Sequence, residues 1–278
     1  MKPPRPFTFG KNRRDGFTLT ELLVVIVTVA ILGLLLPAIA GTKPNSQAFQ
    51  CLENLRQLTL GWQMYAGDNS GKLAPGGDQQ TQPATPTDPK ILPGGIWVQW
   101  CPGIMNIFNI NATNFIQAGA IYPYVNTINV YKCPADHSFI RFGPNLYPKL
   151  RSYSMNCYLS PILPWTSVGL DGTRNFYKDT DDTKPGPSMT YVFIGENEYS
   201  INDSFFVSDP NQGNYWQDIP ATRHAGSSGL SYADGHSEMK RWTDSSILGY
   251  TGFIGQLSGN PNSSDAAWLQ QRAISFNQ

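Results

Sequence analysis

Residues 11–42 read KNRRDGFTLTELLVVIVTVAILGLLLPAIAGT, and this stretch decides the fold expected for the N-terminal part of the chain. The first 16 residues carry five basic side chains and one acidic one, whereas the 21 residues of 22–42 carry no charge. A helix needs about 20 apolar residues to cross a bilayer, so the run predicts one membrane-spanning helix with a cytoplasmic N-terminus. The alternative is an ordinary secretory signal peptide that is cleaved after Ala40, although its apolar region would be shorter.

The overall composition excludes several classes of protein. The 278 residues balance 20 Lys+Arg against 20 Asp+Glu, and only 14% are charged, compared with about 25% in an average domain. Aromatic residues make up 12%, and there are 26 Gly and 22 Pro. A disordered chain would be charged and poor in aromatics, and a nucleic-acid-binding protein would be basic. The composition favours a loop-rich β protein outside the cytosol and no nucleic-acid partner.

Glu21 stands at the beginning of the apolar run, where an unpaired carboxylate is costly. The segment 13–25, RRDGFTLTELLVV, resembles the class III signal of type IV pilins and type II secretion pseudopilins. This resemblance implies that prepilin peptidase cleaves after Gly16 and that the new N-terminal residue, Phe17, is N-methylated. It also implies that Glu21 is the assembly glutamate, whose carboxylate pairs with the ammonium of a neighbouring subunit and sets the register between subunits.

Gly33 and Pro37 interrupt the same apolar run. Pro37 cannot donate to the helix ladder, so a kink is expected there. Packing of the helix in a filament and the ordinary tolerance of Gly and Pro in membrane helices explain these two residues equally well.

An apolar stripe with helical spacing follows the uncharged run and ends before the turn sequence 67–71. It comprises Ala48, Cys51, Leu52, Leu55, Leu58, Trp62 and Tyr65. Beyond it, short strand-like runs alternate with Gly- and Pro-rich loops; they are Ile96–Trp100, Asn129–Lys132, Arg151–Tyr158, Thr190–Gly195, Ser204–Val207, Leu230–Ala233 and His236–Trp242. The predicted class is α+β and pilin-like. A long N-terminal helix, half in the membrane and half packed, lies against an antiparallel sheet with long loops. The predicted parts are a basic leader over 1–16, a transmembrane and assembly helix over 17–42, a helix continuing into the globular domain over 43–71, and a loop-rich β domain over 72–278.

The clearest predicted hairpin is the segment 229–242, GLSYADGHSEMKRW. Asp234-Gly235 is typical of a two-residue type I′ turn, which would place Leu230 opposite Met239. With His224 it resembles the H-X9-DG segment, here 224–235, at the C-terminus of a large group of bacterial pilin-like proteins. Further stretches similar to that group are CLENLRQ (51–57), YKCPAD (131–136), RSYSMN (151–156) and EN (196–197). The resemblance implies a pilin-like fold but no known ligand.

The four cysteines are Cys51, Cys101, Cys133 and Cys157. An oxidising compartment permits disulfides, and four cysteines allow three pairings. Cys51 with Cys133 is the preferred disulfide, because Cys51 lies on the helical stripe and both residues lie in family-like stretches. Four buried free thiols are the alternative.

Two groups of side chains invite a metal hypothesis. His224, Asp234, His236 and Glu238 lie in or before the hairpin, where the alternative is that the Asp-Gly pair only makes the turn. The acidic loop 171–182 is a candidate calcium site through Asp179, Asp181 and Asp182, although it lacks EF-hand spacing and a solvated loop is preferred. No other cofactor is expected.

Two functions remain. The first is a pilin-like structural subunit of a type II secretion pseudopilus or type IV pilus-like filament. It would be held in the inner membrane with a periplasmic globular domain, and would reach the cell surface after assembly. Its partners would be prepilin peptidase, other pilin-like subunits and the inner-membrane assembly machinery. The second is a membrane-anchored periplasmic module that binds glycan or protein and does not polymerise. An enzyme is not expected, since no motif for a nucleophile, P-loop or dinucleotide site is present.

The leader generates the first testable prediction. Cleavage between Gly16 and Phe17 is expected, because a basic leader ends in glycine directly before an apolar segment that stays attached. N-terminal sequencing of the mature protein checks this. A mature chain that starts after Ala40 would show an ordinary secretory signal and would contradict the pilin hypothesis.

Overall fold

The structure is a computed structural model that describes residues 18–28, 43–78, 81–106, 109, 112–162, 175–181, 184–208, 215–252 and 262–273. The chain forms two compact units, Met1–Lys43 and Pro44–Gln278. Each unit is considered by itself.

In the first unit, residues 19–28 form a helix whose side chains are exposed. Leu19 is 80% exposed, Ile26 59% and Val24 58%. Thr18 precedes the helix and exchanges hydrogen bonds with Glu21: the Thr18 backbone N–H donates to Glu21 Oε2 at 2.9 Å, and the Glu21 N–H donates to Thr18 Oγ1 at 3.3 Å. This reciprocal pair is a capping box and explains where the helix begins.

The predicted N-terminal architecture is contradicted. Within the described segments, no helix is long and apolar enough to cross a membrane, so the predicted single-pass inner-membrane anchor with a periplasmic domain is contradicted as well. The longest described helix, α2 (Lys43–Asp68), has 26 residues and is amphipathic, so it does not join a membrane half to a packed half.

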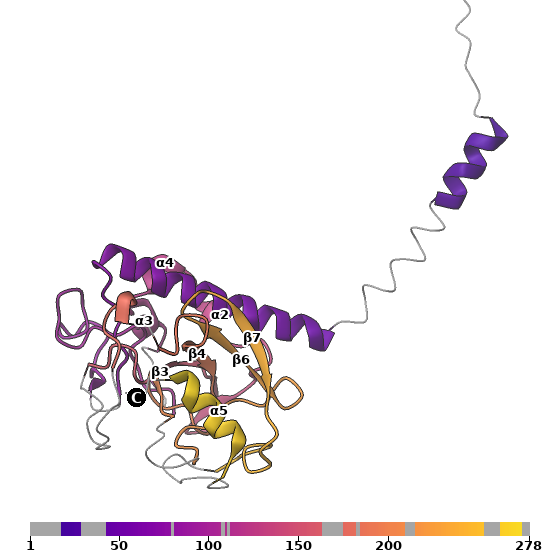
Figure 1. Ribbon diagram of the computed structural model, residues 1–278. Helices are drawn as coiled ribbons and strands as arrows, with labels where there is room; N and C mark the ends of the chain where they lie inside the picture. The colour runs from indigo at the N-terminus through magenta and orange to yellow at the C-terminus, as the bar shows by residue number, and fades with distance from the viewer. Residues whose placement is uncertain are drawn as a thin grey trace, which may run out of the picture. The chain divides into compact units, whose positions relative to one another are not determined.

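The second unit is α+β, and α2 packs along one face of its sheet (Figure 1). The predicted apolar stripe is largely confirmed, since Cys51, Leu55, Leu58 and Trp62 are all at most 4% exposed. Thr59 Oγ1 donates to Ser231 Oγ at 2.7 Å and ties the helix to strand β6 (Ser227–Tyr232). The helix ends where the Gly71 N–H bonds the Ala66 carbonyl at 2.8 Å with a positive φ of 79° at Gly71.

The main sheet has five strands in the order β5-β3-β4-β6-β7. Their bounds are β3 (Tyr153–Asn156), β4 (Tyr191–Gly195), β5 (Phe205–Phe206), β6 (Ser227–Tyr232) and β7 (Ser237–Arg241). All five fall in predicted strand-like runs, with β6 beginning earlier than expected. The sheet is mixed rather than antiparallel, because β3 pairs with β5 in parallel.

The remaining described elements are short, apart from a C-terminal helix. They are α3 (Ala112–Gln117), α4 (Tyr122–Val125), η2 (Ile128–Tyr131), the separate hairpin β1 (Phe139–Phe142) and β2 (Asn145–Pro148), η3 (Asp179–Asp181) and α5 (Ser264–Ala273). Two predicted strands are wrong: Ile96–Trp100 lies in turns, and Asn129–Lys132 overlaps η2, whose i to i+3 bonds close a helical turn.

Two apolar clusters fill the core on the two sides of the sheet. One contains the buried face of α2 with Tyr153 and Phe193, and the other contains Ile194, Leu230 and the inner face of α5. Asn156 at the end of β3 donates to the Ala273 carbonyl at 2.7 Å and fixes α5 to the sheet. The sheet therefore lies between α2 and α5.

The β6–β7 hairpin has a different turn from the one predicted. Leu230 lies opposite Glu238 rather than Met239, a shift of one residue. In the turn only Gly235 has a positive φ, of 94°, whereas a type I′ turn needs two such residues. The Asp234 carboxylate instead accepts the His236 backbone N–H at 3.1 Å, which stabilises a longer loop.

Gly229 in β6 faces α2 at close range. A Cβ built there would lie 2.5 Å from Leu55 Cδ1 and 3.4 Å from Cys51 Sγ. Only a residue without a side chain lets strand and helix approach this closely.

Gly229→Ala should therefore lower the free energy of unfolding by about 1–3 kcal/mol, the usual cost of overpacking a core. Urea unfolding of the full chain measures it. The matched control is Gly67→Ala, since no atom lies within 4 Å of a Cβ there. Equal stability of the two variants would contradict the close packing of β6 on α2.

Candidate functional site

Three side chains from distant parts of the chain meet beneath α2: Cys51 on the helix, Cys133 after η2 and His224 before β6. Their Sγ and ring nitrogen atoms all lie within 4.8 Å of one another. Cys133 Sγ is 3.2 Å from His224 Nε2, and the Tyr153 hydroxyl donates to Cys51 Sγ at 3.3 Å. We call Cys51, Cys133 and His224 the Cys-His cluster.

Local backbone structure holds each member in place. Cys51 is 2% exposed on the inner face of α2. The Cys133 backbone N–H donates to Ser152 Oγ at 3.1 Å, which ties the loop to the beginning of β3. His224 begins a tight turn, in which the Ser227 N–H returns to the His224 carbonyl at 3.1 Å and Ala225 has a φ of 52°. This turn directs the chain into β6.

The two thiols share a hydrogen bond and have opposite pKa shifts. The hydrogen bond from Cys51 is the main factor that lowers the pKa of Cys133; burial opposes it, while His224 and the Ala135 backbone N–H add to it. The same contact raises the pKa of Cys51 well above its usual range, and burial adds to the rise. These opposite shifts favour ionisation of Cys133 before Cys51, because Cys51 donates the hydrogen bond between them.

A layer of charged groups surrounds the Cys-His cluster. Arg223, next to His224, has Nη2 3.4 Å from Asp136 Oδ2 and 3.2 Å from Glu198 Oε2, and it donates to the Glu196 carbonyl at 2.7 Å. Although burial disfavours the ionised form, the Arg223 charge and hydrogen bonds from Ser138 and Ser152 lower the pKa of Asp136. A cavity of about 740 Å³ opens beside Asp136, Glu198 and Arg223.

The five stretches 51–57, 131–136, 151–156, 196–197 and 224–235 converge at this place. Each contributes one residue or more to the Cys-His cluster or the layer around it: Cys51 from 51–57, Cys133 and Asp136 from 131–136, Ser152 from 151–156, Glu196 from 196–197 and His224 from 224–235. Sequence reasoning paired Cys51 with Cys133 but did not place the other three stretches beside them. The available signal was that one cysteine or histidine stands in three of them.

The preferred disulfide is not formed in the structure. Cys51 and Cys133 are neighbours, but all four cysteines are free thiols. Cys101 is buried elsewhere, and burial raises its pKa to about 11. Cys157 is buried in the cluster that packs on α5.

The predicted hairpin metal group does not come together. His224 belongs to the Cys-His cluster, whereas the Asp234 carboxylate is 2.6 Å from His236 Nδ1 at the turn. Glu238 accepts the Tyr232 hydroxyl at 2.5 Å. The two ends of the H-X9-DG segment therefore have different surroundings: His224 lies in the Cys-His cluster, and Asp234 lies in the hairpin turn.

In the described part of the candidate calcium loop, the Asp181 carboxylate accepts hydrogen bonds from the local backbone. Asp181 Oδ2 accepts the N–H groups of Tyr177 and Lys178 at 2.9 and 3.0 Å. Asp179 lies against Gly71, and Asp182 lies outside the described residues. Across the described ranges, the Cys-His cluster is the one group with metal-ligating geometry.

The N-terminal site residues are described only in part. Gly16, Phe17, Gly33 and Pro37 lie outside the described residues. Glu21 is exposed, and the Thr18 backbone N–H and hydroxyl lower its pKa, which keeps the carboxylate charged.

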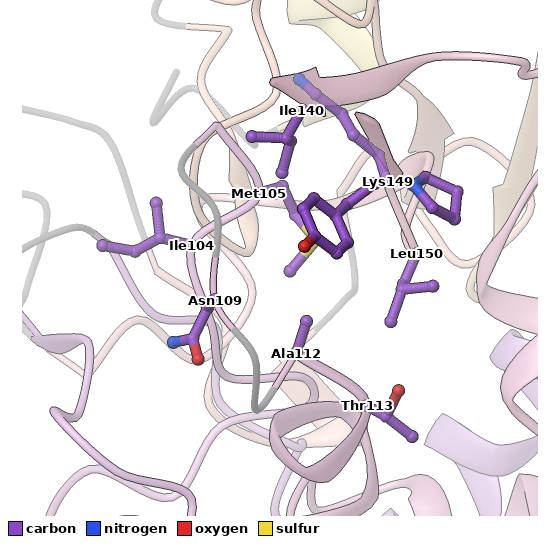
Figure 2. A pocket seen from close by; sticks show the side chains of 10 residues that line it. Ile104, Met105, Asn109, Ala112, Thr113, Ile140, Lys149 and Leu150 are labelled. Carbon is purple, nitrogen blue, oxygen red and sulfur yellow. The ribbon is translucent and has the colours of Figure 1, made fainter. Parts of the chain in front are cut away.

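An apolar cavity of about 310 Å³ lies apart from the Cys-His cluster (Figure 2). Ile104 and Asn109 lie on one side and Lys149 and Leu150 on the other, with Met105 between them. Its lining is mostly apolar. The Lys149 ammonium group donates a hydrogen bond to the Glu198 carbonyl oxygen.

No family model, curated protein or solved structure matches this chain. Its function is therefore argued from its own residues.

A pair of buried carboxyl groups adjoins the charged layer. Burial raises the pKa of Asp218 to about 8, the neighbouring Asp203 adds to the rise, and the Val207 N–H opposes it. Burial also raises the pKa of Glu196 well above its usual range. Both acids stay protonated in the folded protein at pH values where the unfolded chain has lost those protons.

Stability should consequently fall as the pH rises from about 4 towards 8, since a raised folded pKa means that the folded state binds more protons in that window. Asp218→Asn should flatten this slope, because the amide oxygen still accepts the Val207 N–H without a charge. Thermal melting across the window checks it, with the exposed Asp68→Asn as control. A slope that is unchanged in Asp218→Asn would contradict the assignment.

Proposed function

We propose that this chain is a pilin-like structural subunit that prepilin peptidase processes after Gly16 and that assembles into a pseudopilus or pilus-like filament. The proposal has support from the class III signal around Gly16, Phe17 and Glu21. Its partners are the peptidase, other pilin-like subunits and the machinery that assembles them.

The exposure of the helix over 19–28 carries the proposal. Leu22, Leu23 and Val25 are 54%, 57% and 49% exposed, and no face of the helix is polar beyond its first turn and Thr28. A helix that is apolar on all sides is stable only where something covers it. Copies of the same helix, packed side by side, provide such a cover.

Glu21 gives this packing its register. Its carboxylate is charged, and Glu21 follows Phe17 by four residues in the sequence; cleavage after Gly16 frees an ammonium group at Phe17. In an apolar bundle, a charge without a partner is expensive, so each carboxylate favours the position beside the ammonium of a neighbour. The Thr18 contact satisfies Glu21 until that partner arrives.

The capping box makes a sharp test feasible. Glu21→Gln keeps the box, because glutamine serves at this helix position, but it removes the charge that pairs with the ammonium. Filaments sheared from cells should therefore contain far less of the Glu21→Gln chain than of the wild type. Thr18→Ala is the matched control, since it removes the hydroxyl's bonds of the box and leaves the Glu21 charge; its incorporation should stay close to wild type.

A binding module that does not polymerise is the second candidate, and the apolar cavity favours it. The two functions differ in the same assay. If wild type and Glu21→Gln yield equal amounts of multimer at matched expression, Glu21 has no neighbour to pair with, and the filament proposal is wrong.

A further inference from the structure

We propose that Cys51, Cys133 and His224 bind a Zn²⁺ ion that fastens helix α2 to the loop after η2 and to the turn before β6. The inference does not depend on filament assembly. It rests on three ligand atoms of the types that zinc prefers, supplied by three segments far apart in the sequence.

The distances fit a tetrahedral ion. With Zn–S of about 2.3 Å and Zn–N of about 2.0 Å, two ligand atoms around zinc are roughly 3.5–3.8 Å apart. Cys133 Sγ and His224 Nε2 are 3.2 Å apart, and all three ligand atoms lie within 4.8 Å of one another. Side-chain shifts of less than about 1 Å complete this geometry and leave a fourth position for water or another ligand.

The neighbours of the two sulfur atoms suit thiolate ligands. The Tyr153 hydroxyl donates to Cys51 Sγ, and the Ala135 backbone N–H donates to Cys133 Sγ. Such donors outside the ligand set orient the sulfurs and moderate their charge. The Arg223 guanidinium also offsets negative charge at Cys51.

On binding, the zinc ion takes the place of the protons of the two thiols, which are released. Two thiolates and a neutral imidazole give the ion a ligand set of charge −2, so the bound group has no net charge. A neutral group is suited to a position where Cys51 and Cys133 are both 2% exposed. A disulfide between Cys51 and Cys133 would use the same sulfurs but would leave His224 without a role.

The test uses the full chain, purified with reductant and with mild detergent to cover the apolar helix 19–28. Co²⁺ serves as the spectroscopic probe, and the zinc content of the purified chain is measured by mass spectrometry. We expect one zinc per chain, and with Co²⁺ the thiolate-to-metal charge-transfer and visible bands of a tetrahedral site. Zinc should raise the melting temperature in a concentration-dependent way.

His224→Ala and His236→Ala form the decisive pair of variants. His224 is only partly buried, so its loss should leave the fold intact by circular dichroism. Removal of this ligand should weaken zinc affinity by at least about 100-fold, more than the loss of an outer hydrogen bond to a ligand. His236 contacts Asp234 and Tyr232 instead, and its variant should bind like wild type.

Cys133→Ser and Cys101→Ala extend the comparison to the thiols. Cys133→Ser should lose the charge-transfer band, and Cys101→Ala should keep it. Equal affinity of the two histidine variants, or a reduced chain that binds no Co²⁺, would overturn the proposal. A Cys51–Cys133 disulfide found by mass spectrometry in the protein as isolated from cells, with no zinc, would overturn it in favour of a covalent link.

Discussion

The close approach of strand β6 to helix α2 at Gly229 is the constraint on which the rest of the second unit depends. With no side chain at Gly229, the strand reaches the inner face of the helix, where Leu55 and Cys51 lie. The chain enters β6 from the turn at His224, so the same approach carries the imidazole to the thiols. A bulkier residue at this point would disturb the core and the Cys-His cluster together.

The two units differ in how their apolar surfaces are covered. The globular unit has apolar clusters on both faces of its sheet and covers them with α2 and α5. The helix over 19–28 is apolar on its exposed surface and carries one charged carboxylate, held in a capping box at its first turn. The globular unit covers its own apolar surfaces, whereas the helix over 19–28 leaves its apolar side chains exposed.

The sequence pattern predicts much of the second unit, because it reports burial, whereas the predicted long N-terminal helix is wrong. The stripe through Cys51 and Leu58 predicts the packed face of α2, and apolar runs predict the five strands of the main sheet. The sequence pattern failed where tertiary contacts determine the structure. It did not predict the parallel pairing of β3 with β5. It also predicted the wrong turn at Asp234, where a side-chain hydrogen bond is found in place of a second residue with positive φ. The sequence paired Cys51 with Cys133 but did not join His224 to them, because the three residues are separated by at least 82 positions in sequence and only the folded sheet brings them together.

The central claim is that a zinc ion bound by the Cys-His cluster joins three stretches that are far apart in the sequence. X-ray absorption at the zinc edge of the purified full chain tests it most directly, because the spectrum reports the atoms bound to the ion. The account predicts two sulfur scatterers at about 2.3 Å and nitrogen or oxygen at about 2.0 Å, with the nitrogen pattern of an imidazole. A first shell of oxygen and nitrogen alone would show that any bound zinc lies elsewhere and would contradict the junction.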